Sequence, residues 1–155
     1  MSTKIDSAIR MMEQSGEEIL VHGGASEELI LAAESRLGIK FPQDYRYFLR
    51  KYGALCFESE EFYGLTKYGL QSKSIPCAIF ATESAIKLGD ISNKMIKVKS
   101  TGYGPIFCID LTGEYENSPV VETELSFKRE DRKHLVAQCF ADFFYKEIER
   151  AIKEL

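Results

Sequence analysis

The chain has little of what most catalytic and metal sites require. Among its 155 residues there are only two histidines, His22 and His134, and there is no tryptophan. A Ser-His-Asp triad needs a histidine as its base, but neither histidine belongs to a nucleophile motif and no G-x-S-x-G is present. No C-x-x-C pair occurs among the four cysteines, which are Cys56, Cys77, Cys108 and Cys139. Since no His or Cys pair has metal-ligand spacing, we expect no enzyme activity, no cofactor and no metal.

An excess of basic charge is also absent. The net charge is −4 and the pI is about 5.3, which argues against a sequence-independent nucleic-acid binder, because such a protein needs a basic surface. The first residues, MSTKIDSAIRMMEQSGEE, lack the apolar stretch of a signal peptide. No apolar run is long enough to span a membrane. We therefore expect a cytoplasmic protein with reduced thiols that contacts neither nucleic acid nor membrane.

The chain does have the composition of a globular protein, with 45% hydrophobic and 28% charged residues. Its length fits one domain over residues 1–155. Apolar residues spaced three and four apart predict four main helices, over residues 4–14, 26–37, 42–52 and 135–152. The last of these is the strongest helical pattern in the chain. A short helix is also predicted over 82–88.

Strand patterns fill the middle of the chain. They predict strands over residues 57–65, 95–99, 106–111 and 120–125, with a short extended piece at 19–21. Residues 75–81 fit either a strand or a loop, and the charged run 128–133 fits a solvated linker or a helix start. The order of elements predicts an α+β fold, in which N-terminal helices and a long C-terminal helix pack on a mostly antiparallel sheet.

The most specific stretch is AAESRLGIKFPQDYRYFLRKYG, residues 32–53. Gly38 suits the left-handed position after a helix end, and Pro42 suits the start of the next helix. The next helix carries an apolar face at the i, i+3, i+4, i+7 spacing, formed by Tyr45, Phe48, Leu49 and Tyr52. The pattern predicts a helical hairpin with a structural role.

This stretch, Glu34-x-x-Leu37-Gly38-x-x-Phe41-Pro42 and onward to Tyr52-Gly53, resembles the N-terminal signature of the SUKH superfamily. The likeness continues into Phe62-Tyr63-Gly64-Leu65 and, more weakly, into the final helix at Ala141-Asp142-Phe143-Phe144. That superfamily takes part of its name from yeast cell-wall-assembly regulators and includes many bacterial immunity proteins. The resemblance implies a SUKH-like fold and carries no catalytic residue.

An acidic and aromatic segment follows the helical hairpin at residues 57–63. We interpret it in two ways: as an edge strand whose charges keep it soluble, or as a docking surface for a cationic partner. An exposed edge here would also allow pairing with a second copy or a partner strand, so the oligomeric state stays open. The candidate contact residues, inferred from charge and expected exposure, are Glu58, Glu60, Glu61 and Tyr63, with Glu114 and Glu116 as a second acidic loop.

The resemblance implies an immunity protein, or antitoxin, that binds and neutralises a cognate secreted toxin. A basic nuclease is the toxin that an acidic inhibitor suits best, because a nuclease holds phosphates and complementary charge speeds association. The alternative is a non-catalytic regulatory or scaffold module, as the yeast proteins suggest. Those proteins carry long disordered extensions, whereas the helices predicted here reach nearly to the termini. An enzyme without a recognisable motif is the third hypothesis.

Overall fold

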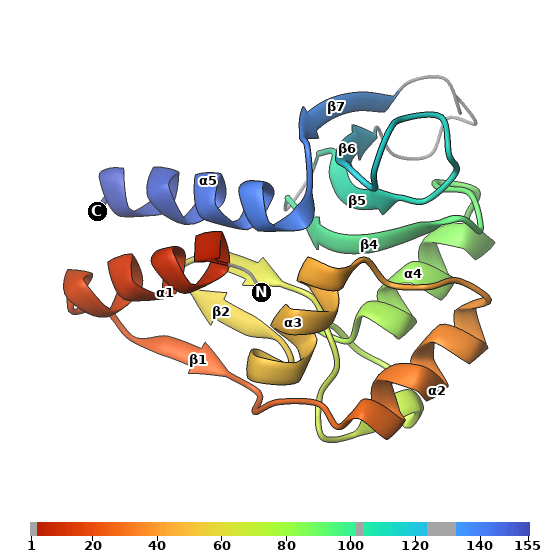
Figure 1. Cartoon of the computed structure of the whole chain (residues 1–155), viewed down its shortest axis with the longest axis horizontal. Helices are drawn as coiled ribbons and strands as arrows, with labels where there is room; N and C mark the ends of the chain where they lie inside the picture. The colour runs from red at the N-terminus through yellow and green to blue at the C-terminus, as the bar shows by residue number, and fades with distance from the viewer. Residues whose placement is uncertain (1–2, 102–103, 124–132) are drawn as a thin grey trace.

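The computed structural model describes residues 3–101, 104–123 and 133–155. Within them the chain is an α+β protein, as the sequence predicted (Figure 1). The helices are α1 (Thr3–Ser15), α2 (Glu27–Leu37), α3 (Gln43–Tyr52), the 3-10 helix η1 (Gly69–Gln71), α4 (Ala78–Lys87) and α5 (Phe140–Lys153). The strands are β1 (Ile19–Val21), β2 (Leu55–Phe57), β3 (Glu60–Phe62), β4 (Met95–Ser100), β5 (Ile106–Asp110), β6 (Val120–Thr123) and β7 (Lys133–Ala137).

Two antiparallel sheets organise these strands. The order is β1-β2-β3 in the first sheet and β4-β5-β6-β7 in the second, and every hydrogen-bonded neighbour is antiparallel. The sheets meet where Tyr63, just after β3, donates its backbone N–H to the carbonyl oxygen of Val98 at 2.8 Å. Helices α1 and α5 lie side by side against the first sheet, and α4 packs on β4 (Figure 1).

Helices α2 and α3 form where their capping residues predict. The Ser26 hydroxyl accepts the backbone N–H of Leu29, and Gly38 closes α2 with φ 71°. The core side of α2 carries Ile30 and Ala33, which are fully buried, while Leu29 and Leu37 are partly buried against the same core.

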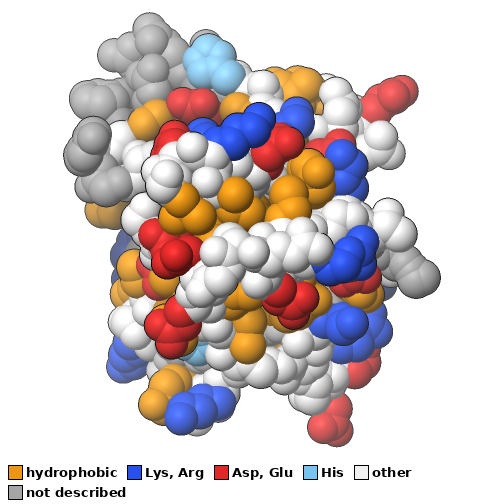
Figure 2. Space-filling view, turned by 90° about the vertical axis from the view of Figure 1, so that its left-hand side faces the viewer, with side chains coloured by type: hydrophobic (Ala, Val, Ile, Leu, Met, Phe, Trp, Pro, Cys, Tyr) orange, Lys and Arg blue, Asp and Glu red, His pale blue; other side chains and the backbone are white. Residues whose placement is uncertain are grey.

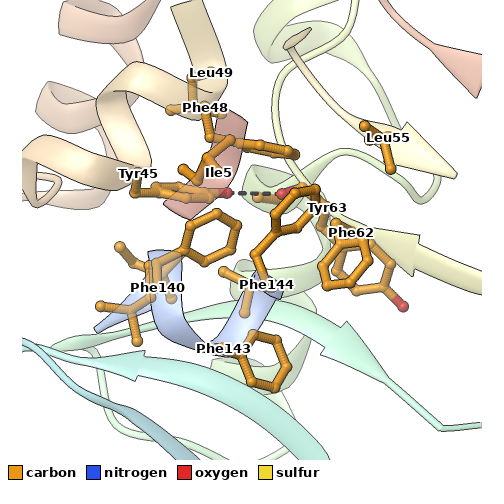
Figure 3. Packing of buried hydrophobic residues seen from close by; sticks show 14 of the residues in the cluster. Ile5, Tyr45, Phe48, Leu49, Leu55, Phe62, Tyr63, Phe140, Phe143 and Phe144 are labelled. Carbon is orange, nitrogen blue, oxygen red and sulfur yellow. Dashed lines mark hydrogen bonds between the residues drawn. The ribbon is translucent and has the colours of Figure 1, made fainter. Parts of the chain in front are cut away.

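Aromatic side chains from α3, β3 and α5 form the centre of the core (Figure 3). Phe48 of α3 lies 5.1 Å from Phe140 and 5.5 Å from Phe144 between ring centroids, and Phe62 of β3 lies 4.7 Å from Phe144. Rings at these separations add to stability beyond the area they bury. The predicted faces of α3 and of the final helix therefore meet each other, and α1 contributes Ile5, Ala8 and Met12 to the same cluster.

Close backbone contacts explain two glycines of the family-like signature, Gly53 and Gly64. A Cβ on Gly64 would lie 1.8 Å from the carbonyl oxygen of Gly53, and a Cβ on Gly53 would lie 2.2 Å from that of Gly23. Leu65 donates its N–H to Gly53 across the same contact. The end of α3 and the segment after β3 can pass this closely only without side chains at these two positions.

Three predicted elements differ from the structure. Residues 57–65 form a hairpin turn and β3 rather than one strand, and α4 begins at Ala78, not at Thr82, so that part of the undecided segment 75–81 is helical. The predicted helix over 135–152 begins at Phe140, because Leu135 and Val136 lie in β7, which pairs with β6. Most of the charged run 128–133 and the end of the predicted strand 120–125 lie outside the described residues.

The N-terminus of α5 is held by a carboxylate from α3. Asp44 accepts the backbone N–H of Ala141 at 2.9 Å, which satisfies a helix donor that no residue within α5 could reach. This bond fixes the two helices that carry the aromatic core. No helix among the described residues is both long and apolar enough to cross a membrane.

Candidate protein-binding surface

The acidic segment at residues 57–63 is built as a tight hairpin. Phe57 and Glu60 are paired in register, so Glu58 and Ser59 make a two-residue loop. Glu58 has φ 55°, the positive value that such loops adopt because it matches the twist of the strands. Since residues directly opposite each other face the same side, Glu60 shares the inner face with Phe57, and Glu58 projects from the loop.

Glu60 is a buried member of an ion network. Its carboxylate lies 2.9 Å from the ammonium of Lys99 and 3.1 Å from the guanidinium of Arg150. Lys99 also contacts Glu147 at 3.2 Å, so the network joins β3, β4 and α5. Glu60 is 8% exposed and Lys99 is 5% exposed. Glu60 therefore holds the hairpin against the rest of the fold and offers little surface to a partner.

Tyr63 is likewise turned into the structure. It is 3% exposed, and its hydroxyl lies 2.8 Å from the hydroxyl oxygen of Ser100. Its carbonyl oxygen accepts the hydroxyl proton of Tyr45 at 2.9 Å (Figure 3). Burial raises the pKa of Tyr63. Tyr63 thus joins α3 to β4 and is not available as an exposed aromatic anchor.

Glu58 and Glu61 remain as surface carboxylates. Glu58 is exposed and Glu61 is half-buried, and no cation of the described residues lies within ion-pair distance of either. Glu17, two residues before β1, lies beside Glu58: partial desolvation and this second carboxylate raise the pKa of Glu58. Two adjacent carboxylates without a cation favour a cationic ligand on electrostatic grounds.

The outer face and edge of the first sheet continue this surface. Leu20, Cys56 and Glu61 are aligned across β1, β2 and β3, and Leu20 is 53% exposed. Glu17 and Glu18 precede β1 in the chain and are both exposed. Figure 2 shows this end of the molecule, where acidic and basic side chains surround hydrophobic ones. We call Glu17, Glu18, Leu20, Glu58 and Glu61 the β1 surface.

The second acidic loop lies elsewhere. Glu114 is exposed but paired with Lys133 at 2.6 Å, and Lys133 also binds the buried carboxylate of Asp110 at 2.7 Å. Glu116 is exposed. Burial alone would raise the pKa of Asp110, but the hydrogen bonds from Lys133 and Thr112 outweigh it and lower that pKa below its ordinary value. This loop therefore carries one carboxylate that is compensated and a second, Glu116, that has no ion pair with any described residue.

The two acidic segments do not form one surface. The loop with Glu114 follows Asp110, which is paired with Met95 at the start of β4. The hairpin is attached to the end of β4, through Lys99 and Ser100. The two segments thus lie at opposite ends of the second sheet (Figure 1). The structure places Glu17 beside Glu58, while Glu61 lies on β3 of the same hairpin. Sequence reasoning missed Glu17, although two glutamates directly before the extended piece Ile-Leu-Val could have indicated it.

The described residues show little chemistry of an active site. They contain no group of three or more His, Cys, Asp or Glu side chains placed to hold a metal ion. All four cysteines are free. Burial raises the pKa of Cys56, Cys108 and Cys139, which disfavours the thiolate that a nucleophile needs. Fold and surface together describe an α+β protein with a charged face suited to contacts with another protein.

Comparison with known proteins gives the family. The chain belongs to the SMI1-KNR4 cell-wall family of SUKH proteins, whose model matches residues 27–144, and SUKH proteins include immunity proteins. The structure is similar to the crystal structure of a protein from Pseudomonas syringae pv. tomato, with a TM-score of 0.55 and 18% identity over 74% of this chain and 81% of that chain. This second likeness concerns the fold alone. No curated protein matches the chain.

Proposed function

We propose that this protein is an immunity protein that binds a cognate secreted toxin and neutralises it stoichiometrically. Membership of the SUKH family is the observation that carries the proposal, because that family includes immunity proteins. The protein acts through a protein–protein interface, in the cytoplasm, and without catalysis of its own. Its toxin is a basic nuclease domain.

The β1 surface supports a basic partner. Glu58 and Glu61 lack an internal cation among the described residues, and Glu17 adds a further carboxylate next to Glu58. A nuclease binds phosphates through Lys and Arg side chains, and these would find their counter-charges here. In the proposed complex Glu58 and Glu61 contact the toxin, while Glu60 and Tyr63 keep the hairpin in position from inside the fold.

Co-expression with the toxin encoded beside this gene tests the proposal. We expect the toxin alone to stop growth and the pair to grow normally. The purified proteins should elute together in gel filtration with one-to-one stoichiometry, and nuclease activity should fall in proportion to added protein. The control is an unrelated acidic protein of similar size, which should not rescue growth. No binding to any toxin encoded nearby would rule the proposal out.

The description of the family by its cell-wall members favours a second candidate, a regulatory or scaffold interaction module. It predicts the opposite genetic setting: no adjacent toxin gene, and capture of a native signalling protein in a pull-down with the wild-type chain. Growth rescue against a toxin would count against it.

A further inference from the structure

The backbone groups that β1 leaves free can be placed from its pairing with β2. His22 donates its N–H to the carbonyl oxygen of Ala54 at 3.1 Å. In an antiparallel ladder, pairs bonded in this way recur at every second residue. Leu20 therefore directs its N–H and C=O toward β2, whereas Ile19 and Val21 direct theirs to the opposite side. That side is the edge of the sheet, since β2 is the one strand paired with β1 in the described residues (Figure 1).

This edge has few of the features that protect sheet edges. Natural edge strands are commonly shielded by lysine, proline or a bulge, but β1 reads Ile-Leu-Val and is in regular register with β2. Leu20 is 53% exposed and Val21 is 48% exposed. An edge with outward backbone groups and exposed aliphatic side chains is a template for strand addition. Its shortness is the one protective feature it has.

The charge around the edge selects what can be added. Glu17 and Glu18 lie directly before β1, and Glu58 lies beside Glu17 in the adjoining hairpin loop. An incoming strand would pass next to these carboxylates. A second copy of this chain is a poor candidate, because both copies would carry a net charge of −4. A strand rich in Lys or Arg instead gains opposite-charge pairs.

We propose that β1 accepts an extended, basic segment of a partner protein as an added strand, paired with the backbone of Ile19 and Val21. The identification of that partner as the toxin rests on the function proposed above. The edge itself lies outside residues 27–144, the part that matches the family model.

A synthetic strand peptide tests the edge without a toxin. The probe is Lys-Val-Lys-Val-Lys-Val-Lys, added to the isotope-labelled full chain and followed by amide NMR spectra. We expect shifts centred on Ile19 and Val21 that shrink as salt is added, and no such shifts with the matched peptide Glu-Val-Glu-Val-Glu-Val-Glu. Equal binding of both peptides, shifts centred elsewhere, or no shifts would overturn the proposal.

A proline substitution separates backbone pairing from charge. Val21→Pro removes an outward N–H and spares the bonds to β2, a position where proline is tolerated. The matched control is Val21→Thr, which keeps the N–H and the β-branched shape. We expect the proline variant to bind the basic peptide about tenfold more weakly than the control, which corresponds to about 1.4 kcal/mol. Unchanged binding in a folded variant would overturn strand addition. If the variant does not fold, Glu17→Lys with Glu58→Lys should weaken peptide binding at least as much.

The outcomes distinguish this inference from the immunity function. Toxin binding that is equal in wild type and in folded Val21→Pro would overturn the edge and leave the immunity function standing. Peptide shifts at Ile19 and Val21 without any toxin binding would support the edge and count against the immunity function. Sedimentation that shows dimers lost on Val21→Pro would overturn the basic partner in favour of a second copy.

Discussion

Among single residues, Lys99 is a buried positive charge that depends on nearby counter-charges. Its ammonium is held by Glu60 and Glu147, and it lies 5.9 Å from the ring centroid of Phe62 and 5.6 Å from that of Phe107. Replacing Lys99 leaves Glu60 and Glu147 to share one cation, the partly exposed guanidinium of Arg150, so one of the two carboxylates loses its counter-charge. We expect Lys99→Met to lower the free energy of unfolding by about 3 kcal/mol, measured by urea denaturation.

The control for this prediction is Lys97→Met, two residues earlier on the same strand. Lys97 is only half-buried, and its side chain forms no ion pair among the described residues. We expect a change of no more than about 0.5 kcal/mol there. Equal losses in the two variants would show that the network around Glu60 does not stabilise the hairpin.

Asp110 gives the protein a defined response to acid. Its folded pKa lies below the ordinary value of 3.8, so the carboxylate contributes stability that is complete above that value. The contribution is lost as the pH falls through the lower, folded pKa. We expect Asp110→Asn to lower the melting temperature at pH 7, and we expect this deficit to shrink as the pH is lowered below 3.8 through the folded pKa. Glu116→Gln in the same loop is the control, and a deficit for Asp110→Asn that persists at low pH would contradict the prediction.

The sequence identifies which residues are charged, but it does not show which residues they contact. The acidic hairpin was predictable as a charged segment, yet nothing local distinguishes Glu60 from Glu58. A two-residue turn after Phe57 changes which side chains alternate between the two faces of the strands, so that Glu60 faces inward. Its cationic partners, Lys99 and Arg150, are distant in sequence. Tyr63 is expected from the sequence to be exposed but is buried, because its partners, Tyr45 and Ser100, belong to other elements.

At the scale of elements, α1 is a structural part of the core although it precedes the matched family range. Ile5 and Met12 are fully buried against α5 and the first sheet. We expect Ile5→Ala with Met12→Ala to lower the free energy of unfolding by at least about 4 kcal/mol, since each change removes buried volume. The control pair is Arg10→Ala with Glu13→Ala on the exposed face of α1. Thermal melting measures the stability of each variant. Similar losses of stability in the two pairs would show that α1 packs loosely.

Elements with strong local signals were predictable, and those defined by distant pairing were not. Helices α2 and α3 begin and end within a residue or two of the predicted positions. Their ends are set by Ser26, Gly38 and Gly53, and capping residues act locally. The stretch Leu135-Val136 fits a helical apolar face equally well, but pairing with β6 makes it a strand. Such pairing depends on tertiary context, which overrides local preference.

At the scale of the whole molecule, the position of the acidic segments decides which of them can act together. The β1 surface and the loop with Glu114 lie at opposite ends of the second sheet. If the basic partner binds at the β1 surface, the association rate should fall by at least about tenfold from low to high salt. We expect Glu17→Gln with Glu58→Gln to remove much of that salt dependence, as measured by stopped-flow mixing with the toxin.

The chain supplies its own control at the other end. Glu114→Gln with Glu116→Gln removes the same formal charge from the opposite end of the sheet. We expect this variant to keep most of the wild-type salt dependence, because screening limits the reach of surface charge to about 10 Å. Equal effects of the two pairs would mean that overall charge, and not the β1 surface, guides association.

The packing of α1 against α5 delays the completion of the fold until the end of synthesis. These helices are separated by nearly the whole length of the chain, and α5 is synthesised after every other described element. The apolar side of α1 therefore stays uncovered on the ribosome until α5 has been made, and β1, which follows α1 directly, is not fixed before then. Contacts so distant in sequence form slowly. Each newly made molecule would thus pass through an interval in which the β1 edge, the proposed docking strand, is not yet in place.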